Sequence, residues 1–189
     1  MQPILLGYEG FPDAICVSVN DAVVHGIPTK DKFKQGDVVK LDLTVAHKGM
    51  VVDSALTVVV GPKSPSADVK RLLEGSKRSL LAGIDAIKGD GTRVGDISAA
   101  VQDVLDKNKL GIVKDLVGHG VGYGVHEEPN IPNYGVRGTG PVLMSGMTIA
   151  IEPMATLGDW RVDFLKDGWT VVSRDGTLSA HFEHTVLIT

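Results

Sequence analysis

The clearest structural signal in the chain is an alternating run at residues 40–60, KLDLTVAHKGMVVDSALTVVV. Both ends of the run are rich in β-branched residues, and Lys48 and Gly49 interrupt the pattern, which predicts two strands joined by a turn. The stretch ICVSVN at residues 15–20 has the same strand character, and the intervening GIPTKDKFKQGD at residues 26–37 carries turn residues. We therefore expect a three-stranded antiparallel unit in the first third of the chain.

Two acidic residues, Asp42 and Asp53, interrupt this expected hairpin. Their separation of eleven residues is odd, so a turn with an even number of residues places both carboxylates on one face, directly opposite or one diagonal step apart. Taken alone, Asp42 fits a solvated polar stripe with Lys40 and Thr44. Asp53 has apolar neighbours on both sides, and an ionised carboxylate in such a strand needs a partner or a metal.

The middle of the chain changes to a helical period. We expect one helix within SADVKRLLEGSKRSLLAGIDAIK at residues 66–88, capped by Ser66 and ended by Gly89 and Gly91. A second helix is expected within VGDISAAVQDVLDKNKLG at residues 94–111. Two helices therefore follow the three strands.

Strand signals return after residue 112. MTIAIEPMA at residues 147–155 is predicted to be one short strand, and WTVVSRDGTLSAHFEHTVLIT at residues 169–189 to be a hairpin with a turn at Asp175 and Gly176. Strands, then helices, then strands indicate an α+β protein. Because the chain contains no obvious repeat, low-complexity segment or linker, we expect residues 1–189 to form a single domain.

Composition and charge narrow the classes of function. Of the residues, 43% are hydrophobic and 22% are charged, as in ordinary folded domains. A net charge of −4 offers no basic surface for nucleic acid or anionic lipid, and no apolar run approaches the roughly 18 residues of a membrane span. With a single cysteine, Cys16, and no recognisable targeting segment, we expect a cytoplasmic protein without nucleic-acid or membrane partners.

Three further residues are unusual for their surroundings. Glu152 interrupts an apolar strand, Glu183 lies between two histidines, and His119 is flanked by glycines. Individually they are explained as a salt-bridged core acid, an exposed strand residue and a turn histidine. Together with Asp42 and Asp53 they form an oxygen-rich set with one nitrogen, which suits two divalent first-row ions such as Mn, Fe, Co or Zn.

Other common chemistries do not fit the chain. HEEPN at residues 126–130 lacks the second histidine of a HExxH zinc helix, and GHGVGYG at residues 118–124 does not satisfy GxGxxG. Neither a GxSxG nucleophile elbow nor a Walker loop is present. Cys16, in an apolar strand, has the character of a small core residue rather than a nucleophile.

Six motifs occur in order: SVNDAVVHGIP (18–28), KLDLTV (40–45), VVDSALT (51–57), VGHGVGYGVHEEPNIPNYG (117–135), IAIEPM (149–154) and SAHFEHT (179–185). Together they resemble type I methionine aminopeptidases, which have the pita-bread metallopeptidase fold, and the likeness runs from about Gly7 to Thr189. The glycine-flanked histidine, IEP and FEH are shared with the wider fold family, which includes proline-specific peptidases. NDAVVHGIP is the form typical of methionine aminopeptidases.

The resemblance implies a role for each candidate residue. The five metal ligands would be Asp42, Asp53, His119, Glu152 and Glu183, with Asp53 and Glu183 bridging two ions. The two active-site histidines would be His25 and His126, and the methionine pocket would be lined by Tyr8, Phe11, Cys16 and Trp169. The implied reaction is the removal of N-terminal methionine from nascent proteins and peptides with a small second residue. The implied nucleophile is a water that bridges the two metals, with Glu152 transferring its proton and His126 stabilising the developing charge.

The resemblance also implies a departure from the family pattern and leaves alternatives open. Relatives have a further N-terminal helix pair packed on the first half of the sheet, so we expect an N-terminally shortened fold with exposed apolar residues on that half. Dimerisation, a partner or poor solubility would follow. A catalytically inactive relative that binds peptides or partners, or a proline-specific aminopeptidase, are the alternative functions. The sequence leaves open the native metal, the second-residue preference and ribosome contact.

Overall fold

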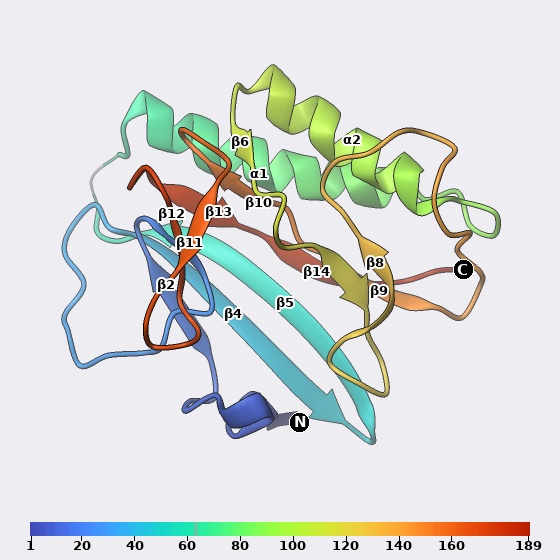
Figure 1. The fold of residues 1–189 in the computed structure, drawn as a ribbon, viewed down its shortest axis with the longest axis horizontal. Coiled ribbons are helices and arrows are strands. Elements are labelled where there is room, and N and C mark those ends of the chain that lie inside the picture. Colours follow the sequence, from blue (N-terminus) through green and yellow to red (C-terminus); the bar gives the residue numbers. More distant parts are fainter. Residues whose placement is uncertain (63) are drawn as a thin grey trace.

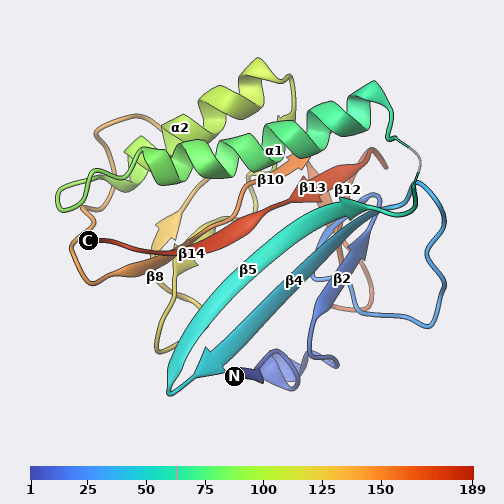
Figure 2. The ribbon, with the colours of Figure 1, turned by 180° about the vertical axis from the view of Figure 1, so that it is seen from behind.

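The structure, a computed structural model, describes residues 1–62 and 64–189. Its centre is an eight-stranded antiparallel sheet in the order β1–β4–β5–β14–β9–β7–β8, with β2 paired to β4 beside β1 (Figures 1 and 2). The strands are β1 (Gln2–Pro3), β2 (Cys16–Val19), β4 (Val38–His47), β5 (Met50–Val59), β7 (Gly118–Gly120), β8 (Glu127–Ile131), β9 (Thr148–Ile151) and β14 (Glu183–Leu187).

Two smaller sheets of three strands lie beside the central sheet. One has the order β13 (Ser179–His181), β10 (Met154–Thr156) and β6 (Gly111–Ile112). The other has the order β11 (Val162–Phe164), β12 (Val171–Ser173) and β3 (Ala22–Val24). A short 3₁₀ turn, η1 (Tyr8–Gly10), follows β1.

The predicted three-stranded unit is confirmed: β2 pairs with β4, and β4 pairs with β5 in a hairpin. His47 pairs with Met50, which leaves a two-residue turn whose φ angles are both positive, as a tight hairpin turn of this length requires. Asp53 lies opposite Thr44, so Asp42 and Asp53 are diagonal neighbours on one face, as their odd spacing predicted.

The expectation of a solvated polar stripe on β4 was wrong. Lys40 and Thr44 are each only 1% exposed, because the face that carries them is covered by the rest of the molecule. The opposite face of the hairpin carries Leu43, Val52, Leu56 and Val58, whose exposed fractions are 40–47%. The predicted exposure of apolar residues on the first half of the sheet is confirmed.

Two helices, α1 (Ala67–Asp85) and α2 (Val94–Lys107), cover one side of the sheets, and the β4–β5 hairpin extends beyond them (Figures 1 and 2). Helix α1 packs on β9, β10, β13 and β14, and helix α2 packs on α1, β6 and β8. Ser66 caps α1 as predicted, since its hydroxyl accepts a hydrogen bond from the backbone N–H of Val69. Between helices and sheet lies the largest apolar cluster, which includes Leu72, Leu80, Ile97, Val101, Leu105, Ile149 and Ile151.

The helices are close-packed, and their ends differ slightly from the expectation. A Cβ atom at Gly83 of α1 would lie 2.9 Å from a methyl carbon of Val101 in α2, so a larger residue would push the helices apart. Helix α1 ends at Asp85, before the predicted glycines, and the Lys88 backbone N–H donates to the Thr92 hydroxyl instead. Within the described residues, no helix has the length and apolar character needed to cross a membrane.

The C-terminal third contains two errors of prediction, both caused by strands that change sheets. Residues 147–155 form two strands, β9 and β10, separated at Glu152 and Pro153, because proline lacks the N–H that a continuing ladder needs. The turn at Asp175 and Gly176 exists, but β12 pairs with β3 and β11 whereas β13 pairs with β10, so they form no hairpin. A second break, at Phe182, separates β13 from β14 and precedes Glu183.

Candidate active site

The acidic residues gather on the face of the central sheet that points away from the helices. Ile149 and Ile151 of β9 belong to the cluster beneath the helices, so Ala150 between them points to the other face. Ala150 is paired on one side with His119 of β7 and on the other with Thr185 of β14. His119 therefore points to the same face of the sheet as Asp53 and Glu183.

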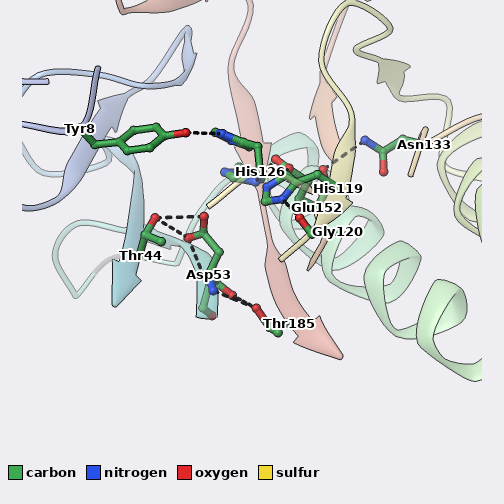
Figure 3. A network of polar contacts seen from close by, with 11 residues as sticks. Tyr8, Thr44, Asp53, His119, Gly120, His126, Asn133, Glu152 and Thr185 are labelled. Carbon is green, nitrogen blue, oxygen red and sulfur yellow. Dashed lines mark hydrogen bonds and ion pairs between the residues drawn. The ribbon is translucent and has the colours of Figure 1, made fainter. Parts of the chain in front are cut away.

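Asp53, His119 and Glu183 converge at the centre of this face. One potential ligand atom from each residue lies within 4.8 Å of the others, and all three residues are buried. They come from β5, β7 and β14, which lie far apart in sequence and are joined only by the sheet. Figure 3 shows Asp53 and His119 directed toward a common space, with Glu152 close beside them.

Asp53 is held by neighbouring hydroxyl groups. The Thr44 hydroxyl lies 3.0 Å from each carboxylate oxygen of Asp53, to which it can donate, and the Ser54 backbone N–H donates to Oδ1, also at 3.0 Å (Figure 3). The Thr185 hydroxyl bonds both the N–H and the carbonyl of Asp53 at 2.8 Å. Thr44 and Ser54 thus hold the carboxylate of Asp53, and Thr185 holds its backbone.

Glu152 lies where the chain leaves β9, and it contacts two imidazoles. Its Oε1 is 3.4 Å from Nε2 of His119 and its Oε2 is 3.4 Å from Nε2 of His181. Its side chain is 13% exposed. The side-chain amide of buried Asn133 donates to the Glu152 carbonyl at 3.1 Å, which anchors the backbone at the break between β9 and β10.

The tautomer of His119 follows from its surroundings. Its Nδ1 lies 2.9 Å from the Gly120 carbonyl oxygen, which can only accept a hydrogen bond. Nδ1 therefore carries the proton in the neutral ring, and the lone pair of Nε2 faces the acids. A backbone carbonyl on the remote nitrogen is the usual arrangement of a histidine that binds a metal through the other nitrogen.

The acids of the site are in an environment that disfavours their charge. Burial raises the pKa of Asp42 to about 7, and the negative charges of Asp53 and Glu152 add to the effect. Burial likewise raises the pKa of Glu152 to about 8, and it raises the pKa of Glu183 well above its ordinary value. Clustered carboxylates together with one free imidazole nitrogen fit divalent cations, which would compensate their charge.

An apolar cavity of about 120 Å³ opens beside the acids. It is lined by Leu5, Tyr8, Glu9, Phe11, Cys16, His25, Asp42, Thr44, Asp53, Val125, His126 and Trp169. Phe11 and Trp169 meet edge to face with ring centroids 5.2 Å apart. Burial raises the pKa of the Cys16 thiol, so the sulfur is neutral and forms part of the apolar wall. A larger cavity of about 700 Å³, around Ile27 and Phe33, contains none of the five predicted ligands.

The two candidate histidines occupy different environments. The Tyr8 hydroxyl lies 3.1 Å from Nδ1 of His126, whose ring contacts that of His119 with centroids 4.4 Å apart (Figure 3). His25 has a positive φ of 58°, and it is half-buried in the cavity wall. Burial lowers the pKa of His25 to about 4, with neighbouring His181 and His126 adding to the effect, so this imidazole is neutral near pH 7.

The structure thus brings every predicted site residue to one region, and it adds four that the sequence interpretation did not assign to the site. Thr44 was assigned to a solvated stripe, and Asn133, His181 and Thr185 were not singled out. All four contact Asp53 or Glu152. The available signal was the presence of Asn133, His181 and Thr185 inside the motifs NIPNYG and SAHFEHT.

Comparisons with known proteins place the chain among metallopeptidases. Residues 4–189 match the model of metallopeptidase family M24. The chain is 45% identical over 186 residues to the methionine aminopeptidase of Clostridium perfringens, covering 98% of this chain and 74% of that protein. It is 46% identical over 187 residues to methionine aminopeptidase 1 of Bacillus subtilis, covering 99% of this chain and 74% of the relative.

Solved structures agree with the sequence comparison. The methionine aminopeptidase of Thermotoga maritima superposes with a TM-score of 0.95 at 48% identity, covering all of this chain and 75% of that one. A prolidase from Pyrococcus furiosus superposes with a TM-score of 0.70 at 24% identity, covering 93% of this chain and 46% of that one, and shows the fold alone. The predicted pita-bread fold is confirmed, and the chain spans about three quarters of the length of the methionine aminopeptidases that it matches.

Proposed function

Because the chain belongs to metallopeptidase family M24, we propose that it is a metal-dependent methionine aminopeptidase. Its substrates would be nascent proteins and peptides that begin with methionine and have a small second residue. The observation that carries the proposal is the convergence of Asp53, His119 and Glu183 beside an apolar cavity large enough for one side chain. Identity of 41–46% to methionine aminopeptidases over nearly the full chain supports the same activity.

The acids and His119 would hold two divalent ions, with Co, Mn, Fe or Zn as candidates. The ligands would be Asp42, Asp53, His119, Glu152 and Glu183, with Asp53 and Glu183 shared between both ions. When bound, such ions activate a water and polarise the carbonyl group to be cleaved. The raised pKa values of Asp42 and Glu152 support this assignment, because a buried acid cluster needs either protons or cations.

Glu152 would transfer the proton in the reaction. It would accept the proton of the attacking water and deliver it to the leaving amine, which requires a carboxyl group whose two protonation states are both accessible near neutral pH. Its enclosure between His119 and His181 supports this role, because burial moves its pKa toward that range.

His126 would stabilise the charge that develops on the substrate carbonyl oxygen. If the Tyr8 hydroxyl donates to Nδ1, the neutral ring carries its proton on Nε2 and can donate that hydrogen bond to the substrate. His25, neutral near pH 7, would lie near the scissile amide. Both imidazoles line the cavity, as this assignment requires.

The cavity would hold the methionine side chain. Tyr8, Phe11, Cys16 and Trp169 provide aromatic and sulfur-containing walls, against which a flexible thioether packs well. Its volume of about 120 Å³ suits one medium-sized apolar group, since an apolar cavity of roughly 150 Å³ admits benzene. Selection for methionine would therefore depend on volume and polarizability rather than on charge.

Methionine release from short peptides tests the proposal. Protein loaded with Co or Mn should release methionine from Met-Ala-Ser and leave an Ala-Pro peptide intact. Cleavage of Ala-Pro alone would instead indicate a proline-specific aminopeptidase. A protein that binds metal but cleaves neither peptide would contradict the proposal and favour a non-catalytic peptide-binding role. Asp68→Asn, on the exposed start of α1, is a matched control for acid substitutions in the site.

Two broader assignments belong to the same proposal. Residues 1–189 would act as a single catalytic domain, and the exposed apolar face of the β4–β5 hairpin would be covered in solution, with dimerisation as the simplest form. The 40–47% exposure of Leu43, Val52, Leu56 and Val58 supports this association. A cytoplasmic location stays a prediction from the sequence, which left ribosome contact open.

A further inference from the structure

His181 is a buried histidine to which the roles above give no task. It lies at the end of β13 and is 1% exposed. Among the described residues, neither of its ring nitrogens has a hydrogen-bond partner; one other buried side-chain atom, the Ser76 hydroxyl in α1, shares this property. A buried polar group without a partner destabilises the folded state, so an unpaired imidazole calls for an explanation.

The backbone of His181 is fixed by two neighbouring strands. His181 pairs with Met154 of β10, and the Thr57 hydroxyl of β5 donates to its carbonyl at 2.6 Å and accepts from its N–H at 2.9 Å. Thr57 is itself buried. The position of the ring is therefore set by the meeting of β5, β10 and β13 rather than by its own side-chain contacts.

The ring of His181 is directed at Glu152. Its Nε2 lies 3.4 Å from Oε2, a contact that lacks the alignment of a hydrogen bond. The other oxygen, Oε1, lies 3.4 Å from Nε2 of His119. Catalytic hydrogen bonds are often long or poorly aligned before the substrate complex forms, so this contact can tighten when substrate binds.

The two imidazoles differ in what they can offer the carboxylate. Nδ1 of His119 donates to the Gly120 carbonyl, so its Nε2 has a lone pair and no proton to donate. His181 has no such carbonyl on Nδ1, and its proton is free to lie on Nε2. Of the two, His181 is the one that can donate a hydrogen bond to Glu152 in the neutral state.

We propose that His181 is a positioning residue that donates a hydrogen bond from Nε2 to Oε2 of Glu152 and thereby turns Oε1 toward His119 and the metal centre. Its effect on turnover rests on the proposed methionine aminopeptidase activity, whereas its effect on metal affinity rests only on the proposed ligation of a metal ion by Glu152. Partners of ligands beyond the metal itself typically change metal affinity or activity by about 10–100-fold when removed.

Two substitutions distinguish the effect of losing the hydrogen-bond donor from the effect of changing the side-chain volume. His181→Leu removes the donor, and His181→Gln supplies an amide donor in its place. Metal-free proteins are titrated with Mn²⁺ by calorimetry, and kcat and KM are measured with Met-Ala-Ser. We expect His181→Leu to weaken Mn²⁺ binding and to lower kcat by about 10–100-fold each, with KM nearly unchanged. His181→Gln should recover most of both losses.

Ser76→Ala is the matched control, because it removes the other buried unpaired group at a place remote from Glu152. It should leave Mn²⁺ affinity and kcat unchanged. If His181→Leu does not fold, His181→Met, which also lacks a donor, replaces it. Should the folded variant bind Mn²⁺ as the parent does and lose only thermal stability, His181 has a structural role and the proposal is wrong.

Cobalt absorption distinguishes positioning from direct ligation. With Co²⁺ bound, His181→Gln should keep the parent visible spectrum, because the ligand set is unchanged. A shifted spectrum would make His181 a metal ligand and overturn the proposal. If the parent protein binds metal but never releases methionine, while His181→Leu still loses Mn²⁺ affinity, the proposed function fails and the positioning role stands.

Discussion

The two faces of the β4–β5 hairpin reverse the usual distribution of residues. The inner face carries Lys40, Asp42, Thr44, Asp53 and Thr57, most of them buried, whereas the outer face carries exposed leucines and valines. In most sheets with one solvated face, the apolar side is the buried one. Polar side chains can be buried on the inner face because neighbouring groups form hydrogen bonds with them. The inner face therefore gathers the carboxylates that could bind a metal.

Lys40 shows what such burial involves. Its ammonium group donates to the Asn20 carbonyl at 2.8 Å, and burial lowers its pKa to about 7. The leucines and valines of the outer face have no polar side-chain atoms that need hydrogen-bond partners. Substitutions on the inner face should therefore affect metal binding and catalysis, and substitutions on the outer face should affect self-association of the protein.

The largest effect is expected from Asp53→Asn on the inner face. It removes a charged ligand atom at the centre of the acid cluster, so metal affinity should fall by more than the roughly 100-fold upper value for a supporting partner. Methionine release should fall below detection, as measured by calorimetry and a peptide assay. Asp68→Asn should behave as the parent does, and equal affinities in the two variants would contradict the assignment of Asp53.

Thr44→Val should have a smaller effect on the same face. The substitution keeps the shape of the side chain but removes the donor to both oxygens of Asp53, so metal affinity should fall by about 10–100-fold. Thermal stability should also decrease, because Asp53 loses a buried donor. Thr29→Val, in the exposed loop before β4, provides the control. An unchanged Mn²⁺ affinity for Thr44→Val would show that Asp53 is positioned by its other contacts.

The stability of the metal-free protein should depend on pH through the buried acids of the inner face. Because burial raises the pKa of Asp42 to about 7 and of Glu152 to about 8, the folded state binds more protons than the unfolded state, whose carboxyls titrate near pH 4. Burial lowers the pKa values of His25 and His181, which acts in the opposite sense, but the three acids whose pKa values are raised outnumber them. The free energy of unfolding should therefore fall as the pH rises from about 4 to about 8.

Bound divalent ions should flatten this dependence, since they replace the protons as compensation for the carboxylates. Melting temperatures measured across this range, with chelator and with Mn²⁺, check the expectation. A metal-free melting temperature that rises with pH would have the wrong sign for raised carboxyl pKa values.

The smallest effect on catalysis is expected from the outer face. Leu56→Ser and Val58→Thr replace exposed apolar groups, so stability of the monomer should change within about 0.5 kcal/mol and methionine release should persist. Light scattering and binding of a hydrophobic dye should show less association than in the parent protein. A parent protein that is already monomeric and binds no dye would contradict a covered face.

The sequence allowed much of the site to be predicted, because some of its constraints are local. The odd spacing of Asp42 and Asp53 fixes their common face once a two-residue turn joins the strands, since side chains alternate with period two. The capping of α1 by Ser66 was likewise a local property. Motif resemblance then supplied the residues that local spacing could not connect.

The errors came from residues whose surroundings are set by distant segments. The polar stripe of β4 looked solvated because the sequence does not reveal which face other segments cover. The breaks at Pro153 and Phe182 looked like parts of continuous strands because apolar character persists across them. The first break contains Glu152 and the second directly precedes Glu183. The breaks that made the strand prediction wrong therefore also orient these two acids.

What the sequence determined by itself was the α+β order of elements, the shared face of Asp42 and Asp53, and the set of residues with metal-binding chemistry. Only the tertiary structure decided that these residues meet, that Thr44 supports Asp53, and that His181 reaches Glu152. The physical reason is that side-chain alternation and capping act over a few residues. The approach of His181 to Glu152, in contrast, depends on the pairing of β10 with β13.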